Sequence, residues 1–227
     1  MELKCLSSMA TRLMLAELVE NYQKHSSDSI IIESVGGVDA VRRVLAGEAL
    51  DVVILASEAI DKLILAGTVL PGSKVDLANS GVAVALREGA LRPDIATEDG
   101  LRHAVLAAKS IAYSTGPSGV ALARLFERWG IAEEIRDRVV QPPPGIPVGS
   151  LLARGEVEIG FQQLGELIYI SGITVLGPLP AAIRIITTFS AALCNTCTQP
   201  LAARAFIAYM ASSDAAEAKR RQGMDPS

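Results

Sequence analysis

Apolar and polar positions in the first quarter of the chain repeat with two alternating periods. Short apolar runs predict strands, and each run is followed by apolar residues at helical spacing. The predicted strands cover residues 2–7, 29–35 and 51–56, and the predicted helices cover 9–24, 38–45 and 57–66, the last of them capped by Ser57. This β-α-β-α-β-α order predicts a parallel sheet with right-handed crossovers.

A turn at Pro71-Gly72-Ser73 interrupts this order, and a second α/β unit follows. Predicted strands here cover 82–86, 111–114, 157–162, 173–176 and 183–191. Predicted helices cover 97–108, 120–129, 133–139, 149–154, 200–210 and 213–221, the first of them capped by Thr97, and a proline cluster lies at 142–144. The fold class is therefore α/β. We expect two lobes, each a mainly parallel sheet flanked by helices, with a ligand cleft between them. Lobe 1 is predicted to comprise 1–78 plus 197–227, and lobe 2 to comprise 79–196.

The composition narrows the possible partners. Of 227 residues, 50% are hydrophobic and only 4% aromatic, and 21 Lys plus Arg face 25 Asp plus Glu for a net charge of -4. Intrinsic disorder is excluded by the large apolar fraction, and the apolar runs are too short for a membrane span. An acidic chain with few aromatic residues is a poor partner for nucleic acid. We expect no nucleic-acid partner and no membrane insertion.

Three cysteines form a poor disulfide framework. Cys5 lies in a strand-like run and is interpreted as a small core residue. Cys194 and Cys197 form a C-x-x-C pair, for which ordinary packing is favoured over a zinc site or a redox pair. We expect no cofactor and no metal.

No signal peptide is visible at the N-terminus, so the prediction is a cytoplasmic protein if Met1 is the native start and a periplasmic one if a leader was removed.

Four segments lie where ligands of α/β sheets bind, at the carboxyl ends of strands. In the first unit they are Leu6-Ser7-Ser8-Met9 and Ser34-Val35-Gly36-Gly37. Hydroxyls and free N–H groups at a helix start suit an anion, and paired glycines permit close backbone approach and unusual φ. Arg12 is the nearest candidate cation for a carboxylate. The alternatives are an N-cap, a strand-to-helix turn and a solvated arginine.

In the second unit the segments are Ser114-Thr115-Gly116-Pro117-Ser118-Gly119 and Gly160-Phe161-Gln162-Gln163. The first is rich in hydroxyls and N–H groups but is neither a Walker P-loop nor G-x-G-x-x-G. The second offers two amides, which could also be a solvated strand end. A Ser-His-Asp arrangement has little support, because no G-x-S-x-G motif is present and the chain has only two histidines.

In this order, the four segments resemble the periplasmic molybdate-binding protein family of the type II solute-binding superfamily. Further markers are the segments 45–54, 117–119, 154–160, 206–212 and 223–226. The resemblance implies that Ser8 and Ser118 donate to an oxyanion and that a backbone donor lies near Ile146 to Val148. Gln163 stands where molybdate binders have a tyrosine, and Gly36-Gly37 replaces a serine loop. These departures favour a larger organic carboxylate.

The segments 113–119, 160–167 and 177–180 are also similar to the branch of this family that includes aconitate isomerase. This similarity implies an alternative function, isomerisation of a polycarboxylate by an allylic proton shift. No base for that reaction is obvious at the four segments, although Glu33 and Glu166 lie near two of them, and the catalytic residues stay unknown. The predicted partners are a small anionic ligand and, if the protein is exported, an ABC permease. The predicted ligand-binding residues are Ser7, Ser8, Met9, Arg12, Gly36, Gly37, Ser114, Gly116, Ser118, Gly119, Pro147, Gln162 and Gln163.

Overall fold

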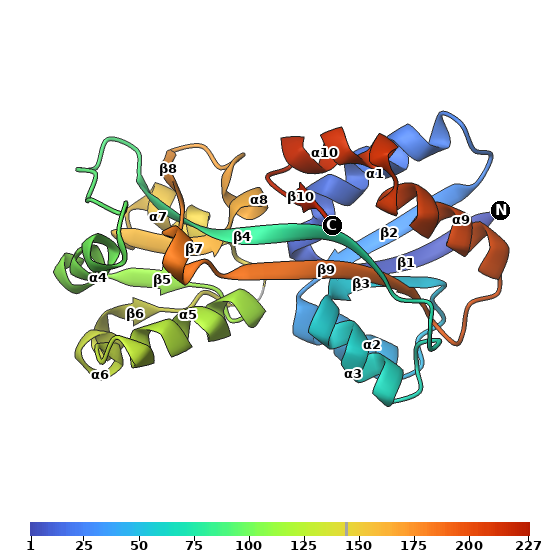
Figure 1. Ribbon diagram of the computed structural model, residues 1–227, viewed down its shortest axis with the longest axis horizontal. Helices are drawn as coiled ribbons and strands as arrows, with labels where there is room; N and C mark the ends of the chain where they lie inside the picture. Colours follow the sequence, from blue (N-terminus) through green and yellow to red (C-terminus); the bar gives the residue numbers. More distant parts are fainter. Residues whose placement is uncertain (144) are drawn as a thin grey trace. The chain divides into compact units, whose positions relative to one another are not determined.

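A computed structural model describes residues 1–143 and 145–227 of the chain (Figure 1). Pro144, part of the proline cluster, lies outside the described residues. The chain forms two compact units, Met1–Ser80 with Thr187–Ser227 and Gly81–Ile186. The chain therefore re-enters the first unit at Thr187, whereas the sequence predicts re-entry at residue 197. The reason is that strand β9 (Ile186–Leu193) pairs through Phe189–Leu193 with β3 (Val52–Ala56), and these five residues are buried in the first unit.

The first unit contains a mixed sheet in the order β2-β1-β3-β9-β4. Strands β1 (Glu2–Ser8), β2 (Ser29–Val35) and β3 are parallel, which confirms the prediction for the first quarter of the chain. Strand β9 runs antiparallel to β3, and β10 (Asp225–Pro226) pairs with β4 (Val75–Arg87). The helical segments are η1 (Met9–Thr11), α1 (Arg12–Gln23), α2 (Gly37–Leu45), α3 (Ser57–Leu65), α9 (Pro200–Ala211), η4 (Ser213–Ala215) and α10 (Ala216–Arg221).

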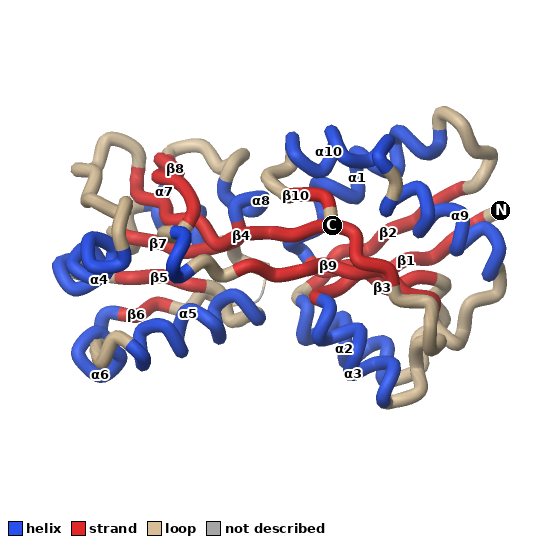
Figure 2. The backbone as a smooth tube through the Cα atoms, viewed as in Figure 1, coloured by secondary structure: helices blue, strands red, loops and turns tan. Residues whose placement is uncertain are grey.

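The first sheet has a separate hydrophobic core on each face. Because strand side chains alternate, Leu3 and Val52 join a cluster with α1 and α9, whereas Leu6 and Val53 join one with α2 and α3. Figure 2 shows these two pairs of helices on opposite sides of the strands. Helices on both faces leave the carboxyl ends of β1, β2 and β3 as the polar edge of this sheet.

The second unit is built around the order β4-β7-β5-β6. Strand β5 (Ile111–Tyr113) is parallel to β7 (Ile159–Gln163) and β6 (Val139–Val140), whereas β7 and β8 (Ile173–Pro178) run antiparallel to β4. The helical segments are α4 (Glu98–Ala107), α5 (Pro117–Arg128), α6 (Ala132–Ile135), η2 (Arg136–Arg138), α7 (Val148–Arg154), α8 (Leu164–Leu167) and η3 (Ala181–Ile183). One core packs around Phe126 and Phe161, and another packs around Val148 and Leu152.

Local capping agrees with the sequence at one helix and differs at another. Thr97 caps α4 by accepting a hydrogen bond from the N–H of Gly100 at 3.0 Å, as predicted. Ser57 does not cap α3, because Ala56 is the N-cap residue and Ser57 is already helical. Strand β4 also begins at Val75, earlier than predicted, because its polar residues form hydrogen bonds with hydroxyls of β9. Ser190 donates to the Asp76 carboxylate at 2.6 Å, and Thr188 donates to the Asn79 amide oxygen at 2.7 Å.

Candidate functional site

The predicted segments of the first unit meet at one edge of its sheet. Ser7 lies opposite both Ser34 of β2 and Ile54 of β3, so these three parallel strands end side by side. A helical segment begins directly beyond each strand: η1 after β1, α2 after β2 and α3 after β3. Each helix start presents N–H groups that no helical carbonyl accepts, which is the arrangement expected of an anion site.

The two serines at the end of β1 have different roles. The Ser7 Oγ lies 2.7 Å from the Ser34 Oγ, so this hydroxyl is paired within the sheet. Ser8 is the N-cap residue of η1, yet its side chain makes no capping hydrogen bond, and its Oγ is buried without a partner. The capping interpretation of Ser8 is therefore wrong, and its hydroxyl makes no hydrogen bond with the described residues.

Arg12 differs from the other arginines near this edge. It is the first residue of α1, its side chain is exposed, and it makes no ion pair with the residues that the structure describes. Arg42 pairs with Asp39, and Arg43 bonds both Glu33 and Glu48. Of these three guanidinium groups, only that of Arg12 is uncommitted. Met9, in η1, offers its backbone at the same strand end.

The glycine pair leaves the start of α2 open. Gly36 is the N-cap residue with φ -57° and ψ 137°, and Gly37 has no positive φ either, so the chain does not use the unusual φ that paired glycines permit. A Cβ at Gly37 would meet no other atom within 4 Å. Neither backbone strain nor close packing demands the glycine at 37, so its effect is to leave space beside the N–H groups at the start of α2.

In the second unit, two hydroxyls lie at the start of α5. The Ser114 Oγ is 3.3 Å from the Ser118 Oγ, and Ser118 is buried although it lies in the first turn of the helix. Gly116 is the N-cap residue in an extended conformation, and Pro117 occupies the first helical position. The predicted turn therefore exists as a hydroxyl-lined start of a twelve-residue helix.

Gly119 has a packing role at the start of α5. A Cβ at this position would lie 1.6 Å from the carbonyl oxygen of Ser114 and 2.7 Å from its carbonyl carbon. Both atoms belong to the backbone and cannot move aside without shifting the strand end. Glycine is required here because α5 begins in direct contact with the chain that leaves β5.

The loop before α7 does not supply the donor expected near residues 146–148. The N–H of Ile146 bonds the carbonyl of Pro143 at 3.1 Å, and that of Val148 bonds the Gln162 Oε1 at 2.8 Å. Pro147 has no N–H and caps α7. These groups are thus satisfied within the protein, and Gln162 acts here as a structural residue that holds the start of α7.

Gln163, the last residue of β7, has the opposite character. Its side chain is buried, and its Oε1 has no hydrogen-bond partner. Within the described ranges, four buried side-chain oxygens lack a partner, those of Ser8, Ser80, Gln163 and Gln222. Two of these four, Ser8 and Gln163, are predicted binding residues at strand ends. Unpaired buried polar atoms are costly, so they mark the positions where a ligand would compensate.

The structure separates the two glutamates considered as bases. Both oxygens of the exposed Glu33 accept hydrogen bonds from Arg43 at 2.7 Å, and these bonds lower the pKa of Glu33. Burial raises the pKa of Glu166 to about 7, although a hydrogen bond with Gln162 opposes the shift. Sequence reasoning alone could not choose between them, because the state of Glu33 depends on Arg43, ten residues away in the chain.

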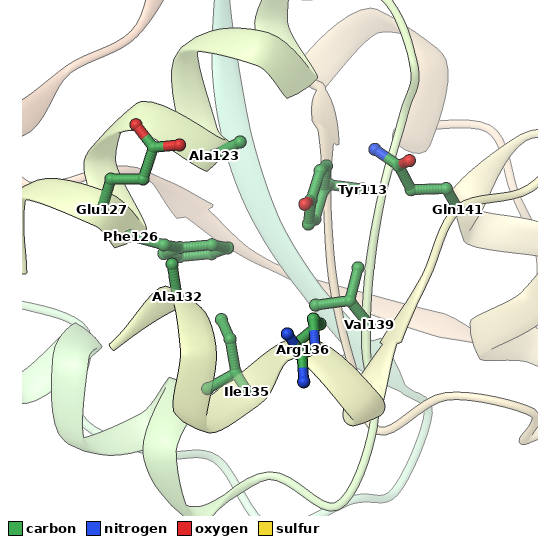
Figure 3. A pocket seen from close by; sticks show the side chains of 9 residues that line it. All are labelled: Tyr113, Ala123, Phe126, Glu127, Ala132, Ile135, Arg136, Val139 and Gln141. Carbon is green, nitrogen blue, oxygen red and sulfur yellow. The ribbon is translucent and has the colours of Figure 1, made fainter. Parts of the chain in front are cut away.

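A surface pocket of about 290 Å³ in the second unit is lined in part by Tyr113, the last residue of β5. Figure 3 shows the rings of Tyr113 and Phe126 on its wall, with Arg136 and Gln141 from the chain around β6. None of the predicted binding residues lines it. In the described part of the chain, no helix has the length and apolar character to cross a membrane, and no group of three or more His, Cys, Asp or Glu side chains could hold a metal ion.

Comparison with known proteins places these features in a family. Residues 3–225 match the family described as bacterial extracellular solute-binding protein. An aconitate isomerase from a Pseudomonas species is 38% identical over 185 residues, which cover 81% of this chain and 70% of that protein. The periplasmic molybdate-binding protein of Azotobacter vinelandii superimposes with a TM-score of 0.80 at 21% identity over 98% of both chains. A sulfate-binding protein from Mycobacterium tuberculosis gives a TM-score of 0.80 at 15% identity, covering 99% of this chain and 86% of that one. The predicted type II solute-binding fold is confirmed.

Proposed function

Because this chain belongs to the bacterial extracellular solute-binding protein family, we propose that it binds a small anion, and that the anion is an organic carboxylate. The observation that carries the proposal is the pair of buried, unpartnered oxygens on Ser8 and Gln163. Both belong to strand ends where helices begin, and there helix N–H groups favour negative charge. The Ser8 hydroxyl can donate a hydrogen bond to an anion at the end of β1, and the Gln163 Oε1 can accept one from a hydroxyl group of a ligand at the end of β7; either bond would remove the cost of leaving that oxygen unpaired.

Three features favour a carboxylate over a compact tetrahedral oxyanion. Gln163 presents an amide, which has both a donor and an acceptor, and so suits a ligand carrying hydroxyl or carboxyl groups as well as charge. Arg12 supplies an uncommitted guanidinium, whose planar fork matches a carboxylate. The open space at Gly37 leaves room for a ligand larger than a tetrahedral oxyanion.

Isomerisation of a polycarboxylate is a second candidate function. It is favoured by the 38% identity to a protein named aconitate isomerase. Such a reaction needs a group that removes a proton from carbon and returns it, together with cations and helix ends that hold the carboxylates.

For the solute-binding role, we propose that an ABC permease receives the ligand outside the cytoplasm, in keeping with the extracellular character of the family.

The test is a binding screen with matched variants. Calorimetry with citrate, cis-aconitate, trans-aconitate, molybdate and sulfate should give binding for one or more of the three carboxylates and none for molybdate or sulfate. Ser8→Ala should weaken carboxylate binding about tenfold or more, the usual loss for a hydrogen bond to a charged group. Ser27→Ala is the control, because Ser27 is exposed and lies before the amino end of β2.

The outcomes separate the alternatives. Binding of molybdate without any carboxylate would contradict the organic ligand and leave anion binding intact. Equal affinity in Ser8→Ala and in the wild-type protein would contradict the placement of the site. Conversion of cis-aconitate to trans-aconitate by the wild-type protein would establish the second candidate function.

A further inference from the structure

A second surface pocket in the second unit, also of about 290 Å³, brings three arginines together. Arg124 and Arg128 are four residues apart and therefore lie on one face of α5, whereas Arg184 comes from the segment that follows η3. The complete lining is Ala121, Arg124, Leu125, Arg128, Ala182, Ile183, Arg184 and Ile185. The pocket thus gathers positive charge from two segments that are remote in the chain.

The backbone on both sides of this pocket is held by the core of the unit. Leu125 and Ile183 are buried and belong to the hydrophobic cluster that also contains Phe126. The N–H of Ile183 donates to the Pro180 carbonyl at 2.9 Å, and the carbonyl of Ile185 accepts the N–H of Val82, on β4, at 3.0 Å. The arginines therefore extend from positions that packing and hydrogen bonds fix relative to each other.

Two of the three guanidinium charges are uncompensated. Arg124 and Arg184 are exposed, and neither makes a hydrogen bond or an ion pair with the residues that the structure describes. Arg128 donates to the Oε1 of Glu98 at 3.1 Å, so its charge is paired. Glu127, also on α5, lines the other pocket (Figure 3). The uncommitted charges of this pocket thus suit a ligand that carries two negative charges.

The chemistry of the lining favours a phosphate group with a short carbon chain. A phosphate monoester carries nearly two negative charges at neutral pH and presents three acceptor oxygens on one atom, so two guanidinium forks can bond the same group. A single carboxylate has one charge and two oxygens. The remaining five lining residues, Ala121, Leu125, Ala182, Ile183 and Ile185, are aliphatic and suit a carbon chain attached to the phosphate.

We infer that this pocket between α5 and residues 182–185 is a second ligand site, and that it takes a small phosphate monoester. The inference does not rest on the proposed function, because none of Ser8, Arg12 and Gln163 lines the pocket. On α5 itself, Arg128 lies ten residues beyond Ser118, which corresponds to about 15 Å along the helix axis. The two sites are therefore separate on this helix.

The experiment titrates the wild-type protein with glycerol 3-phosphate and, separately, with succinate, using calorimetry at pH 7.5. Glycerol 3-phosphate should bind at this pocket more tightly than succinate. Arg124→Gln and Arg184→Gln should each weaken its binding about tenfold, and the double variant about 100-fold, because each substitution removes one charged donor. Amide NMR shifts on adding the ligand should concentrate in the second half of α5 and in residues 182–185.

Two further variants separate this site from other causes. Arg92→Gln makes the same change in net charge at an exposed arginine of the same unit that does not line the pocket, and should leave the affinity within about twofold. Ser8→Ala alters the strand-end site of the proposed function and should also leave binding of glycerol 3-phosphate at α5 unchanged. Because Arg124 and Arg184 are exposed and unpaired, their variants should fold, and thermal unfolding verifies this.

Several results would overturn the inference and leave the proposed function intact. These are the absence of saturable binding of glycerol 3-phosphate by the folded wild-type protein, an equal loss of affinity in Arg92→Gln, and a loss in Ser8→Ala with none in the two pocket variants. Tighter binding of succinate at the same arginines would contradict the phosphate group. Failure of all carboxylates to bind at the strand ends would contradict only the proposed function.

Discussion

The Oε1 of Gln162 accepts a hydrogen bond from the backbone N–H of Val148 at 2.8 Å, whereas the Oε1 of its neighbour Gln163 has no partner. Both side chains are buried, and they leave β7 on opposite faces of the strand. One glutamine thus stabilises the fold at the start of α7, and the side-chain oxygen of the other is unpaired.

The two glutamines should therefore respond differently to substitution. Gln162→Ala leaves the N–H of Val148 buried and unpaired, and should lower the free energy of unfolding by about 1–3 kcal/mol. Gln163→Ala removes no internal hydrogen bond of its Oε1, so it should change stability less and weaken carboxylate binding. Urea unfolding and calorimetry of both variants measure the two effects. A larger loss of stability in Gln163→Ala would contradict this assignment.

Two glycines at helix starts provide a second contrast. Gly119→Ala places a Cβ 1.6 Å from the Ser114 carbonyl oxygen, so it should destabilise the protein by about 3 kcal/mol or more or prevent folding. Gly37→Ala meets nothing within 4 Å, and should leave stability unchanged or raise it by up to about 1 kcal/mol. Thermal unfolding of the purified variants distinguishes them, and equal effects would show that the contact at Gly119 is relieved elsewhere.

The pH dependence of stability should reveal Glu166. Its pKa in the folded protein, about 7, lies above the ordinary value of a glutamate, so the folded state binds the proton more tightly than the unfolded state. The favourable contribution of the protonated form is complete below about pH 4.5 and is lost as the pH rises through 7.

Glu166→Gln should remove that loss. Between pH 5 and pH 8, the free energy of unfolding of the variant should rise relative to that of the wild-type protein, by as much as roughly 3 kcal/mol. Urea midpoints at a series of pH values measure the difference. Glu33→Gln serves as the control, and a difference that stays constant with pH would contradict the raised pKa.

Binding should depend on Arg12 and not on Arg42. Arg12→Gln removes an uncommitted guanidinium at the start of α1 and should weaken carboxylate binding about tenfold. Arg42→Gln breaks only an exposed pair with Asp39, which contributes little to stability. Titration of both variants with the same carboxylate provides the comparison, and similar affinities would place the carboxylate away from α1.

The cysteines should differ in reactivity with a thiol reagent at neutral pH. Burial raises the pKa of Cys194 to about 12 and also raises that of Cys5, and both side chains are buried. Cys197 is partly exposed, so it should be modified first, and slowly, because burial raises its pKa as well. Modification with an aromatic disulfide reagent, followed with and without urea, gives the order. Rapid reaction of all three in the native protein would contradict it.

The sequence by itself determined the elements that depend on local pattern. The strand and helix sequence of the first unit follows from apolar periodicity, and Thr97 follows from local capping chemistry. The four polar segments at strand ends were also readable, because strand ends and helix starts are marked by serine, glycine and proline. The family and its fold followed from the same segments.

Only the tertiary structure decided what each of these polar residues does, because the answer lies in partners remote in the chain. The Ser7 hydroxyl is hydrogen bonded with that of Ser34, whereas the Ser8 hydroxyl has no partner. The carbonyl of Ser114 leaves no space for a Cβ at residue 119, and the Gln162 side chain accepts a hydrogen bond from the N–H of Val148. The state of Glu33 depends on Arg43, and that of Glu166 depends on burial. Local pattern places a side chain at the edge of a sheet, whereas hydrogen-bond partners and burial, set by packing, determine whether it stabilises the fold or stays free for a ligand.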